Sequence, residues 1–211
     1  MKLTRIKNTL LSLVVLLAIA SCGDNKPTEN RNTTTSPAPS TSAQKSKESF
    51  LYVSDESDNQ IAELVLAGND ATINYESRTF FGERKGDKLK YYDQQNNMLY
   101  EIKYKENSFK LRDSNSALLW KVKTYDNKIK LADNEEMENP IEIKKKSDNK
   151  YVVYRNGEES KVIRIESDKL PININNTYYT RGFTNNYHSA ILLMDDFKDL
   201  EKYMILVELN R

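Results

Sequence analysis

A motif of about twenty residues recurs between residues 89 and 164, and this repeat constrains the fold more than any other feature of the chain. Each copy holds two short segments in which apolar and charged residues alternate. Trp120 and Val122, for example, alternate with Lys121 and Lys123. A period of two with one charged face is typical of an antiparallel strand that buries its other face. The segments, in chain order, are 89–93, 99–103, 109–113, 119–123, 129–133, 141–144, 151–156 and 162–165.

Each copy of the repeat predicts one hairpin of two strands, because turn-forming residues separate the segments. Similar patterns outside the repeat predict further strands at Ile61–Ala67, Ala71–Tyr75, Arg78–Arg84 and Thr177–Phe183. The domain is therefore predicted to be mainly β, an antiparallel meander of about 11–13 strands. We expect this sheet to close as a barrel or to form two packed sheets, since either arrangement removes exposed edges.

The segment 190–209 follows a different pattern, with apolar residues at helical spacing. We favour a single C-terminal helix that packs into or against the β-structure. The alternative is a strand at 190–194, a short helix and a strand at 204–209, because short apolar runs fit either structure. The positions of the helical stripe are Ala190, Leu193, Met194, Phe197, Leu200, Met204 and Val207.

The hairpins resemble those of the tubby/LURP-one/scramblase superfamily. The shared phrase begins with Asp and, after five variable residues, continues with Leu, Tyr or Trp, a charged residue, a β-branched residue and Lys. It occurs as Asp93 with 99–103 and as Asp113 with 119–123, and Asp133 begins a further copy. That superfamily folds as a closed barrel of about twelve strands around a hydrophobic helix. The resemblance implies that 190–209 is this helix, although its polar middle, 195–202, departs from the pattern.

The N-terminus has the three regions of a signal peptide: basic residues at its start, an apolar run over 10–20, and small residues before a cysteine. The sequence Ile19-Ala20-Ser21-Cys22 resembles the lipobox of bacterial lipoproteins. The resemblance implies transfer of a diacylglycerol to Cys22, cleavage before this residue and acylation of its new amine, with palmitate among the attached acyl chains. Two or more acyl chains hold a soluble domain on a bilayer, whereas a single chain binds marginally.

Composition changes abruptly near residue 50, which predicts three parts of the chain. Residues 1–21 are the lipoprotein signal peptide, and 22–49 are a disordered Ser/Thr/Pro-rich tether that begins at the lipidated Cys22. Residues 50–211 are the β-rich domain, which contains the ~20-residue hairpin repeats at 89–164 and every aromatic residue of the chain. Since Cys22 is the only cysteine, the mature chain has no thiol for disulfides, catalysis or metal binding.

No motif in the sequence predicts a catalytic or metal site. His188 is the only histidine and has no recognisable nucleophile or orienting partner, so we expect a surface or helix-start residue. The acidic cluster Asp55, Glu56 and Asp58 lacks the ligand spacing of a Ca²⁺ loop. The stretch 82–86 lacks the Lys-Ser/Thr ending of a phosphate loop. We therefore expect neither a cofactor nor an enzymatic activity.

Charge and aromatic residues give the two candidate ligand surfaces. Residues 88–164 hold seventeen basic and thirteen acidic residues, an excess of four, on the predicted outward face of the repeat. Such a face suits anionic headgroups, although alternating lysines are also common on solvated sheets. The tyrosines Tyr178, Tyr179 and Tyr187 are a candidate ligand rim. The candidate headgroup face comprises Lys103, Lys121, Lys123, Lys130, Lys144, Lys145 and Lys146.

These patterns predict a lipid-anchored lipoprotein of the bacterial cell envelope, periplasmic or surface-exposed, that acts as a non-catalytic binding or scaffold module. Its ligand would be lipid-like or an envelope protein, and we expect a monomer. The alternative is a structural envelope protein that binds only other proteins. Nucleic acid is not expected as a partner, because removal of three basic residues with the signal peptide leaves 29 basic against 31 acidic residues.

Overall fold

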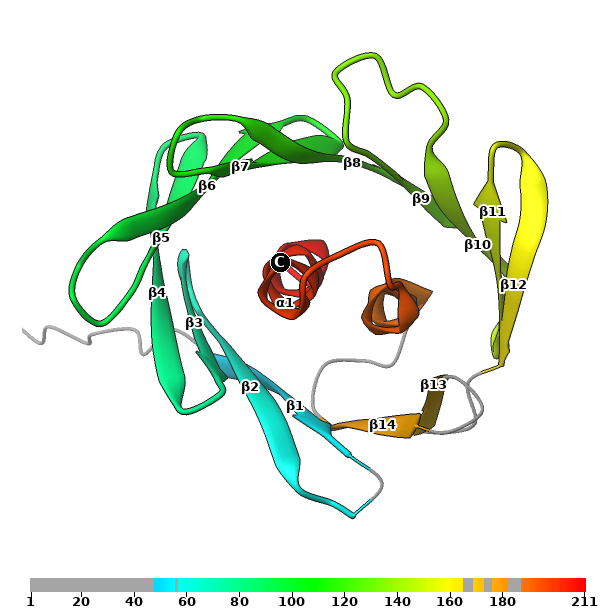
Figure 1. Ribbon diagram of the computed structural model, residues 1–211, viewed down its shortest axis with the longest axis horizontal. Coiled ribbons are helices and arrows are strands. Elements are labelled where there is room, and N and C mark those ends of the chain that lie inside the picture. The colour runs from blue at the N-terminus through cyan, green and yellow to red at the C-terminus, as the bar shows by residue number, and fades with distance from the viewer. Residues whose placement is uncertain (1–47, 56, 165–168, 173–175, 182–186) are drawn as a thin grey trace, which may run out of the picture. The chain divides into compact units, whose positions relative to one another are not determined.

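Fourteen antiparallel strands form one curved sheet in the computed structural model (Figure 1). The structure describes residues 48–55, 57–164, 169–172, 176–181 and 187–211, with the backbone alone for 169–172 and 176–181. The strands are β1 Glu48–Ser54, β2 Gln60–Ala67, β3 Asp70–Tyr75, β4 Arg78–Lys85, β5 Lys88–Tyr92, β6 Met98–Lys105, β7 Ser108–Asp113, β8 Leu118–Tyr125, β9 Lys128–Ala132, β10 Ile141–Ser147, β11 Lys150–Arg155, β12 Glu158–Arg164, β13 Lys169–Ile172 and β14 Asn176–Arg181.

The strand order is β12 to β1 in reverse chain order, followed by β14 and β13, so the first strand also pairs with a late one. The predicted mainly β meander is confirmed. Strands β1 to β12 follow one another as a meander, within the predicted 11–13 strands, and β14 and β13 extend the same sheet beside β1. The sequence analysis did not predict β1 or β13. Strand β1 begins at Glu48, two residues inside the predicted tether.

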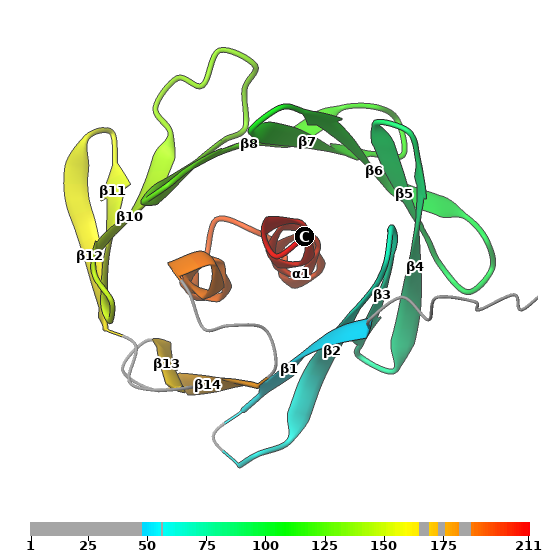
Figure 2. The ribbon, with the colours of Figure 1, turned by 180° about the vertical axis from the view of Figure 1, so that it is seen from behind.

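The sheet neither splits into two packed sheets nor closes through backbone pairing of its described residues. It curves continuously, so that its edge strands β12 and β13 come near each other, as both views show (Figures 1 and 2). Twist accumulates from strand to strand in a long antiparallel meander, and this twist rolls the sheet around its apolar face. The alternative of two packed sheets is therefore wrong.

The aspartates that open the repeated phrase build the turns of the meander. Oδ1 of Asp93 accepts hydrogen bonds from the backbone N–H groups of Gln95 and Asn97, at 2.9 and 2.8 Å. Asp113 and Asp55 accept the same pair of bonds two and four residues further on. In each turn the third residue after the aspartate has a positive φ, which explains the recurrence of Asn, Ser and Asp there. Asp55 is therefore a turn residue.

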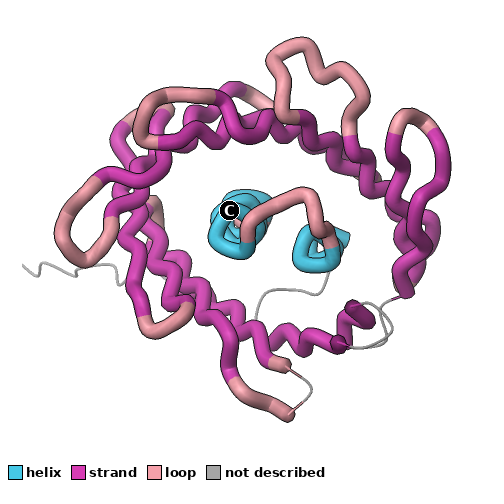
Figure 3. Tube along the Cα trace, in the orientation of Figure 1, coloured by secondary structure: helices cyan, strands magenta, loops and turns pink. Residues whose placement is uncertain are grey.

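Two short helices fill the space inside the curved sheet (Figure 3). A 3₁₀ helix, η1, spans Tyr187–Leu193, and the α-helix α1 spans Asp199–Leu209. Both predictions for 190–209, one long helix or a strand, a helix and a strand, are therefore wrong in detail. Asp195 and Asp196 are exposed between the two helices, so the polar middle of the segment is mostly a connection. The predicted C-terminal helix exists, but it is shorter.

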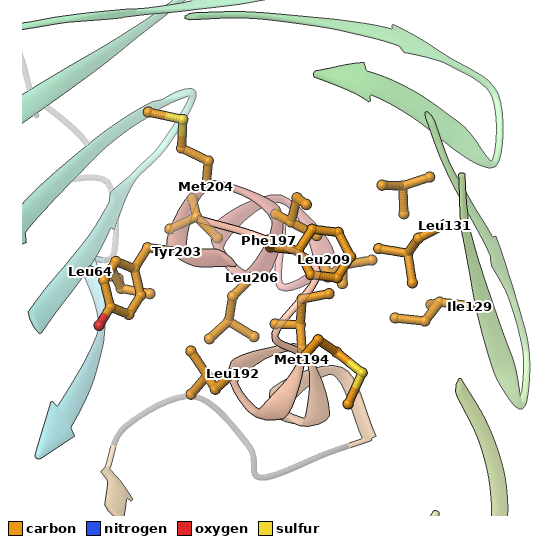
Figure 4. Close-up of a cluster of buried hydrophobic side chains, with 14 of the residues drawn as sticks. Leu64, Ile129, Leu131, Leu192, Met194, Phe197, Tyr203, Met204, Leu206 and Leu209 are labelled. Atoms are coloured by element: carbon orange, nitrogen blue, oxygen red, sulfur yellow. The ribbon is translucent and has the colours of Figure 1, made fainter. Parts of the chain in front are cut away.

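The inner face of the sheet packs directly on these helices. All residues from Glu201 to Leu209 are buried, so α1 is surrounded by protein on every side. Figure 4 shows Met204, Leu206 and Leu209 of α1 beside Leu64 from β2 and Leu131 from β9. These side chains belong to one hydrophobic core that includes residues of both helices and of β1 to β12. The core therefore occupies the interior, where a lipid-binding barrel would keep an apolar cavity.

The two buried glutamates of α1, Glu201 and Glu208, are paired with donors from the sheet and with Arg211. Trp120 Nε1 donates to Glu201 Oε2 at 3.0 Å. Glu208 accepts hydrogen bonds from the hydroxyls of Tyr91 and Tyr104 and, at 2.7 Å, from Nε of Arg211. Burial raises the pKa of the Glu208 carboxyl above its ordinary value, while the Arg211 guanidinium acts in the opposite direction. These partners explain how a helix with two buried glutamates fits inside the sheet.

Candidate anion-binding site

Five lysines lie directly opposite one another across five neighbouring strands. The strand registers pair Lys85 of β4 with Lys88 of β5, Lys88 with Lys103 of β6, Lys103 with Lys110 of β7, and Lys110 with Lys121 of β8. Their sequence neighbours point inward, as the fully buried Ile102 illustrates, so the lysines share the outer face. Like charges directly opposite each other destabilise a sheet, because their Cβ atoms are only about 5 Å apart. We call these lysines, which are paired in register, the lysine row.

Two glutamates offset part of this repulsion. Glu101 accepts from Lys88 Nζ, with both carboxylate oxygens at 3.1 Å. Glu135, from the loop between β9 and β10, contacts three cations: Lys110 Nζ at 2.5 Å, Arg112 Nη2 at 2.8 Å and Lys121 Nζ at 3.8 Å. The three cations lower the pKa of the Glu135 carboxyl, the hydrogen bond from Lys110 most of all.

A cavity of about 720 Å³ lies over this part of the outer face and continues to the hairpin between β6 and β7. Its walls carry seven cationic side chains and the two carboxylates of Glu101 and Glu106, and the Glu135 carboxylate beside them brings the formal charge to +4. The cations are Lys88, Lys103, Lys105, Lys110, Arg112, Lys121 and Lys123. Among the described residues, Lys103, Lys105 and Lys123 have no ion pair, so positive charge remains uncompensated in the cavity.

The position of the cavity within the sheet argues against a role of these lysines in protecting sheet edges. Strand β8 is the fifth strand from the β12 edge, and β5 to β7 lie further inside. Lysines that prevent aggregation belong on edge strands, where backbone groups are unpaired. A cluster of cations at the centre of a sheet instead offers a binding surface for anions.

The seven lysines of the predicted headgroup face do not form one surface. Lys103, Lys121 and Lys123 line the cavity, whereas Lys130 and Lys144 share the carboxylate of Glu142, at 2.6 and 2.8 Å. Two further lysines have other partners: Lys145 pairs with Asp148 at 2.7 Å, and Lys146 lies over the ring of Tyr154 at 5.4 Å.

Sequence reasoning missed four cations of the cavity, Lys88, Lys105, Lys110 and Arg112. Strand alternation could have placed them on the outward face beside Lys103. Glu135 gave no signal, because a loop residue has no register in a pattern of strands.

The predicted tyrosine rim is described only in part. Tyr187 is buried in η1, and its hydroxyl donates to the carbonyl oxygen of Tyr125 at 3.0 Å. Its ring also packs against the ring of Tyr151, with centroids 6.2 Å apart. These contacts give Tyr187 a place in the core. The side chains of Tyr178 and Tyr179 lie outside the described residues.

His188 lies in η1 and lines a second cavity, of about 820 Å³, at the end of the sheet where α1 ends. Burial lowers the pKa of His188 to about 4, so this ring is neutral at pH 7. Glu208 also lines this cavity, but its oxygens already accept from Tyr91, Tyr104 and Arg211. Within the described ranges, no cluster of His, Cys, Asp or Glu has the geometry of a metal site.

Comparisons of the chain with models of protein families, with curated proteins and with solved structures found no match. The resemblance to the tubby/LURP-one/scramblase superfamily therefore depends on the repeated phrase alone. The predicted signal peptide and Cys22 lie outside the described residues. In the part of the chain that is described, neither helix is long and apolar enough to cross a membrane.

Proposed function

We propose that this chain is a lipid-anchored lipoprotein of the bacterial cell envelope, and that its β-domain is a non-catalytic module that binds an anionic, lipid-like ligand. The observation that carries the proposal is the cavity on β5–β8, with its formal charge of +4 when the Glu135 carboxylate is included. Each lysine near an anionic membrane surface contributes about 1 kcal/mol of attraction. Three cations without an ion-pair partner among the described residues are therefore enough for a measurable preference.

The sequence supplies the support for the cellular location. Acyl chains on Cys22 would hold the domain at a membrane, and the chain between Cys22 and Glu48 would let it move relative to the bilayer. Anionic headgroups would then be within reach of the cavity. The likeness of the repeated phrase to the tubby/LURP-one/scramblase superfamily agrees with a lipid-like ligand.

A second candidate function, a structural protein that binds only other proteins, is favoured by an apolar row elsewhere on the outer face. The strand registers align Phe50, Val65, Thr72, Phe81 and Tyr92 across β1 to β5. Phe50 and Phe81 are 36 and 47% exposed. Exposed apolar patches mark protein interfaces when they are contiguous, and this row is narrow. We therefore place it second.

Vesicle binding tests the proposed function. The Cys22→Ser chain, which lacks the anchor, should sediment with vesicles of phosphatidylcholine and phosphatidylglycerol, and less with phosphatidylcholine alone. Lys103→Gln with Lys123→Gln should reduce binding about tenfold or more. The matched control is Lys146→Gln with Lys198→Gln, which removes the same charge from exposed lysines outside the cavity. Equal loss in both double variants would show that the cavity is not the site.

Metabolic labelling tests the anchor separately. Cells fed labelled palmitate should transfer the label to the wild-type chain and not to the Cys22→Ser chain. Absence of label from both chains would rule out the lipid anchor on Cys22, whatever ligand the domain binds.

A further inference from the structure

We infer that the Glu135 carboxylate occupies the place of an acidic group of the ligand, so that the basic cavity takes an anion with at least two acidic groups, as in a diphosphorylated compound. This inference rests on the proposed function and specifies its ligand. It follows from an uneven division of the cations: three of them surround Glu135, and three others have no carboxylate partner among the described residues.

The first subsite is the group Lys110, Arg112 and Lys121 around Glu135. The side chains of Arg112 and Lys121 are 23 and 17% exposed, so the strands hold them in place more firmly than most surface cations. Lys110 and Arg112 contact the Glu135 carboxylate directly, and Lys121, 3.8 Å from that carboxylate, donates to the backbone carbonyl oxygen of Glu135. Three cations gathered in this way have the arrangement that a phosphate group requires, since its oxygens accept several charge-assisted hydrogen bonds. A phosphate with two negative charges would compensate these cations better than a carboxylate with one.

The second subsite is the group Lys103, Lys105 and Lys123. The registers place Lys105 and Lys123 on either side of Ser108, in the row next to the lysine row, and Lys103 belongs to the lysine row itself. None of the three has an ion pair within the described ranges. Adjacent rows are about 7 Å apart along a strand, and adjacent strands are about 5 Å apart. Both subsites therefore lie within reach of one ligand with two acidic groups.

The Glu135 carboxylate can leave the first subsite more easily than a side chain of the sheet could, while the backbone carbonyl oxygen of Glu135 keeps its hydrogen bond from Lys121 Nζ. Glu135 belongs to the connection between Ala132 and Ile141, which projects outward from the curved sheet (Figure 1). Its side chain is 41% exposed, and water can solvate the carboxylate as it withdraws. The connection has its own support, since Asn134 Oδ1 accepts from the backbone N–H of Glu138 at 2.8 Å. A ligand would first occupy the open subsite and then replace Glu135 at the other.

A charge-matched pair of variants tests this inference. Glu135→Gln removes the carboxylate that contacts Lys110, Arg112 and Lys121. Glu138→Gln makes the same charge change on the same loop, at a residue outside the cavity lining that has no ion pair among the described residues. The probe is tripolyphosphate, measured by titration calorimetry on the Cys22→Ser chain at fixed ionic strength. Glu135→Gln should bind it about five- to twentyfold more tightly than the parent, while Glu138→Gln changes affinity by less than twofold. Fluorescence of Trp120 confirms that each variant is folded.

The outcomes separate this inference from the proposed function. Equal affinities of Glu135→Gln and Glu138→Gln, with binding by the parent intact, would overturn the competition by Glu135 and leave the proposed function in place. Absence of binding to tripolyphosphate and to anionic vesicles by every variant would remove both.

Vesicles identify the source of the acidic groups. One set contains cardiolipin and the other phosphatidylglycerol, in phosphatidylcholine and at equal total negative charge. If the parent prefers cardiolipin and the Glu135→Gln variant prefers it more strongly, the result supports a lipid with two phosphates as the ligand. Tighter binding of tripolyphosphate without this preference supports a soluble ligand with several phosphates.

Discussion

The ring of Tyr91 lies over Gly82 on the neighbouring strand, so closely that a Cβ atom at position 82 would lie 2.8 Å from Tyr91 Cε1. The two residues are register partners in β5 and β4. The absent side chain of Gly82 thus leaves room for an aromatic ring that is fully buried, and the hydroxyl of Tyr91 donates to Glu208 Oε1 at 3.3 Å. Through this hydrogen bond, the sheet contacts the helix that it surrounds.

Gly82→Ala should destabilise the protein by about 1–3 kcal/mol, because the added methyl group collides with the Tyr91 ring, and the packed core leaves this ring no space to move into. Urea unfolding followed by fluorescence measures the loss. The same substitution in a Tyr91→Leu background should cost less, since the ring is then absent. An equal cost in the two backgrounds would mean that contact with Tyr91 is not the cause.

Glu208→Ala should lower the free energy of unfolding by about 3–5 kcal/mol. The substitution leaves the hydroxyls of Tyr91 and Tyr104 and the Arg211 guanidinium without their buried acceptor. Tyr91→Phe, which removes a single donor, should cost about 1 kcal/mol. The ratio of the two losses tests whether Glu208 is the centre of the network, and comparable losses would contradict this view.

Stability should fall as the pH falls from about 6.5 to about 4, in part because of His188. Burial lowers the pKa of His188 to about 4 in the folded protein, whereas in the unfolded chain it is about 6.5. Between these values the unfolded state binds the extra proton, so acid favours unfolding. At pH 4.5 the contribution is about 2.5 kcal/mol. Urea unfolding of His188→Gln should show a correspondingly weaker pH dependence between 7 and 4.5, and identical profiles would argue against this role.

Trp120 should report whether the helices are docked inside the sheet. It is the only tryptophan, its ring centroid is 4.1 Å from that of Phe197, and its Nε1 donates to Glu201. Phe197→Ala should shift the emission of Trp120 to longer wavelength and cost about 3–5 kcal/mol. Phe81→Ala, on the outer face, should leave the emission unchanged and cost less than about 0.5 kcal/mol. An emission shift in the Phe81 variant alone would contradict the packing.

The alternation within segments such as 119–123 predicted strands and their inward faces, because period two is a local property of an extended chain. The aspartates of the repeat likewise predicted turns, since their hydrogen bonds reach only two and four residues along the chain. Sequence did not reveal β1, whose first two residues, Glu48 and Ser49, are polar, yet it pairs with both β2 and β14. It also could not decide between helix and strand for 190–209, where the apolar runs are short.

The sequence by itself determined the meander and the outward direction of Lys103, Lys121 and Lys123, because both follow from local alternation. Only the tertiary structure decided that the sheet curves around η1 and α1, that Glu208 finds its donors on β5 and β6, and that Glu135 lies among the cations of β7 and β8. These features depend on strand register and on contacts between distant residues. A charge pattern along the chain does not specify which charges meet across strands.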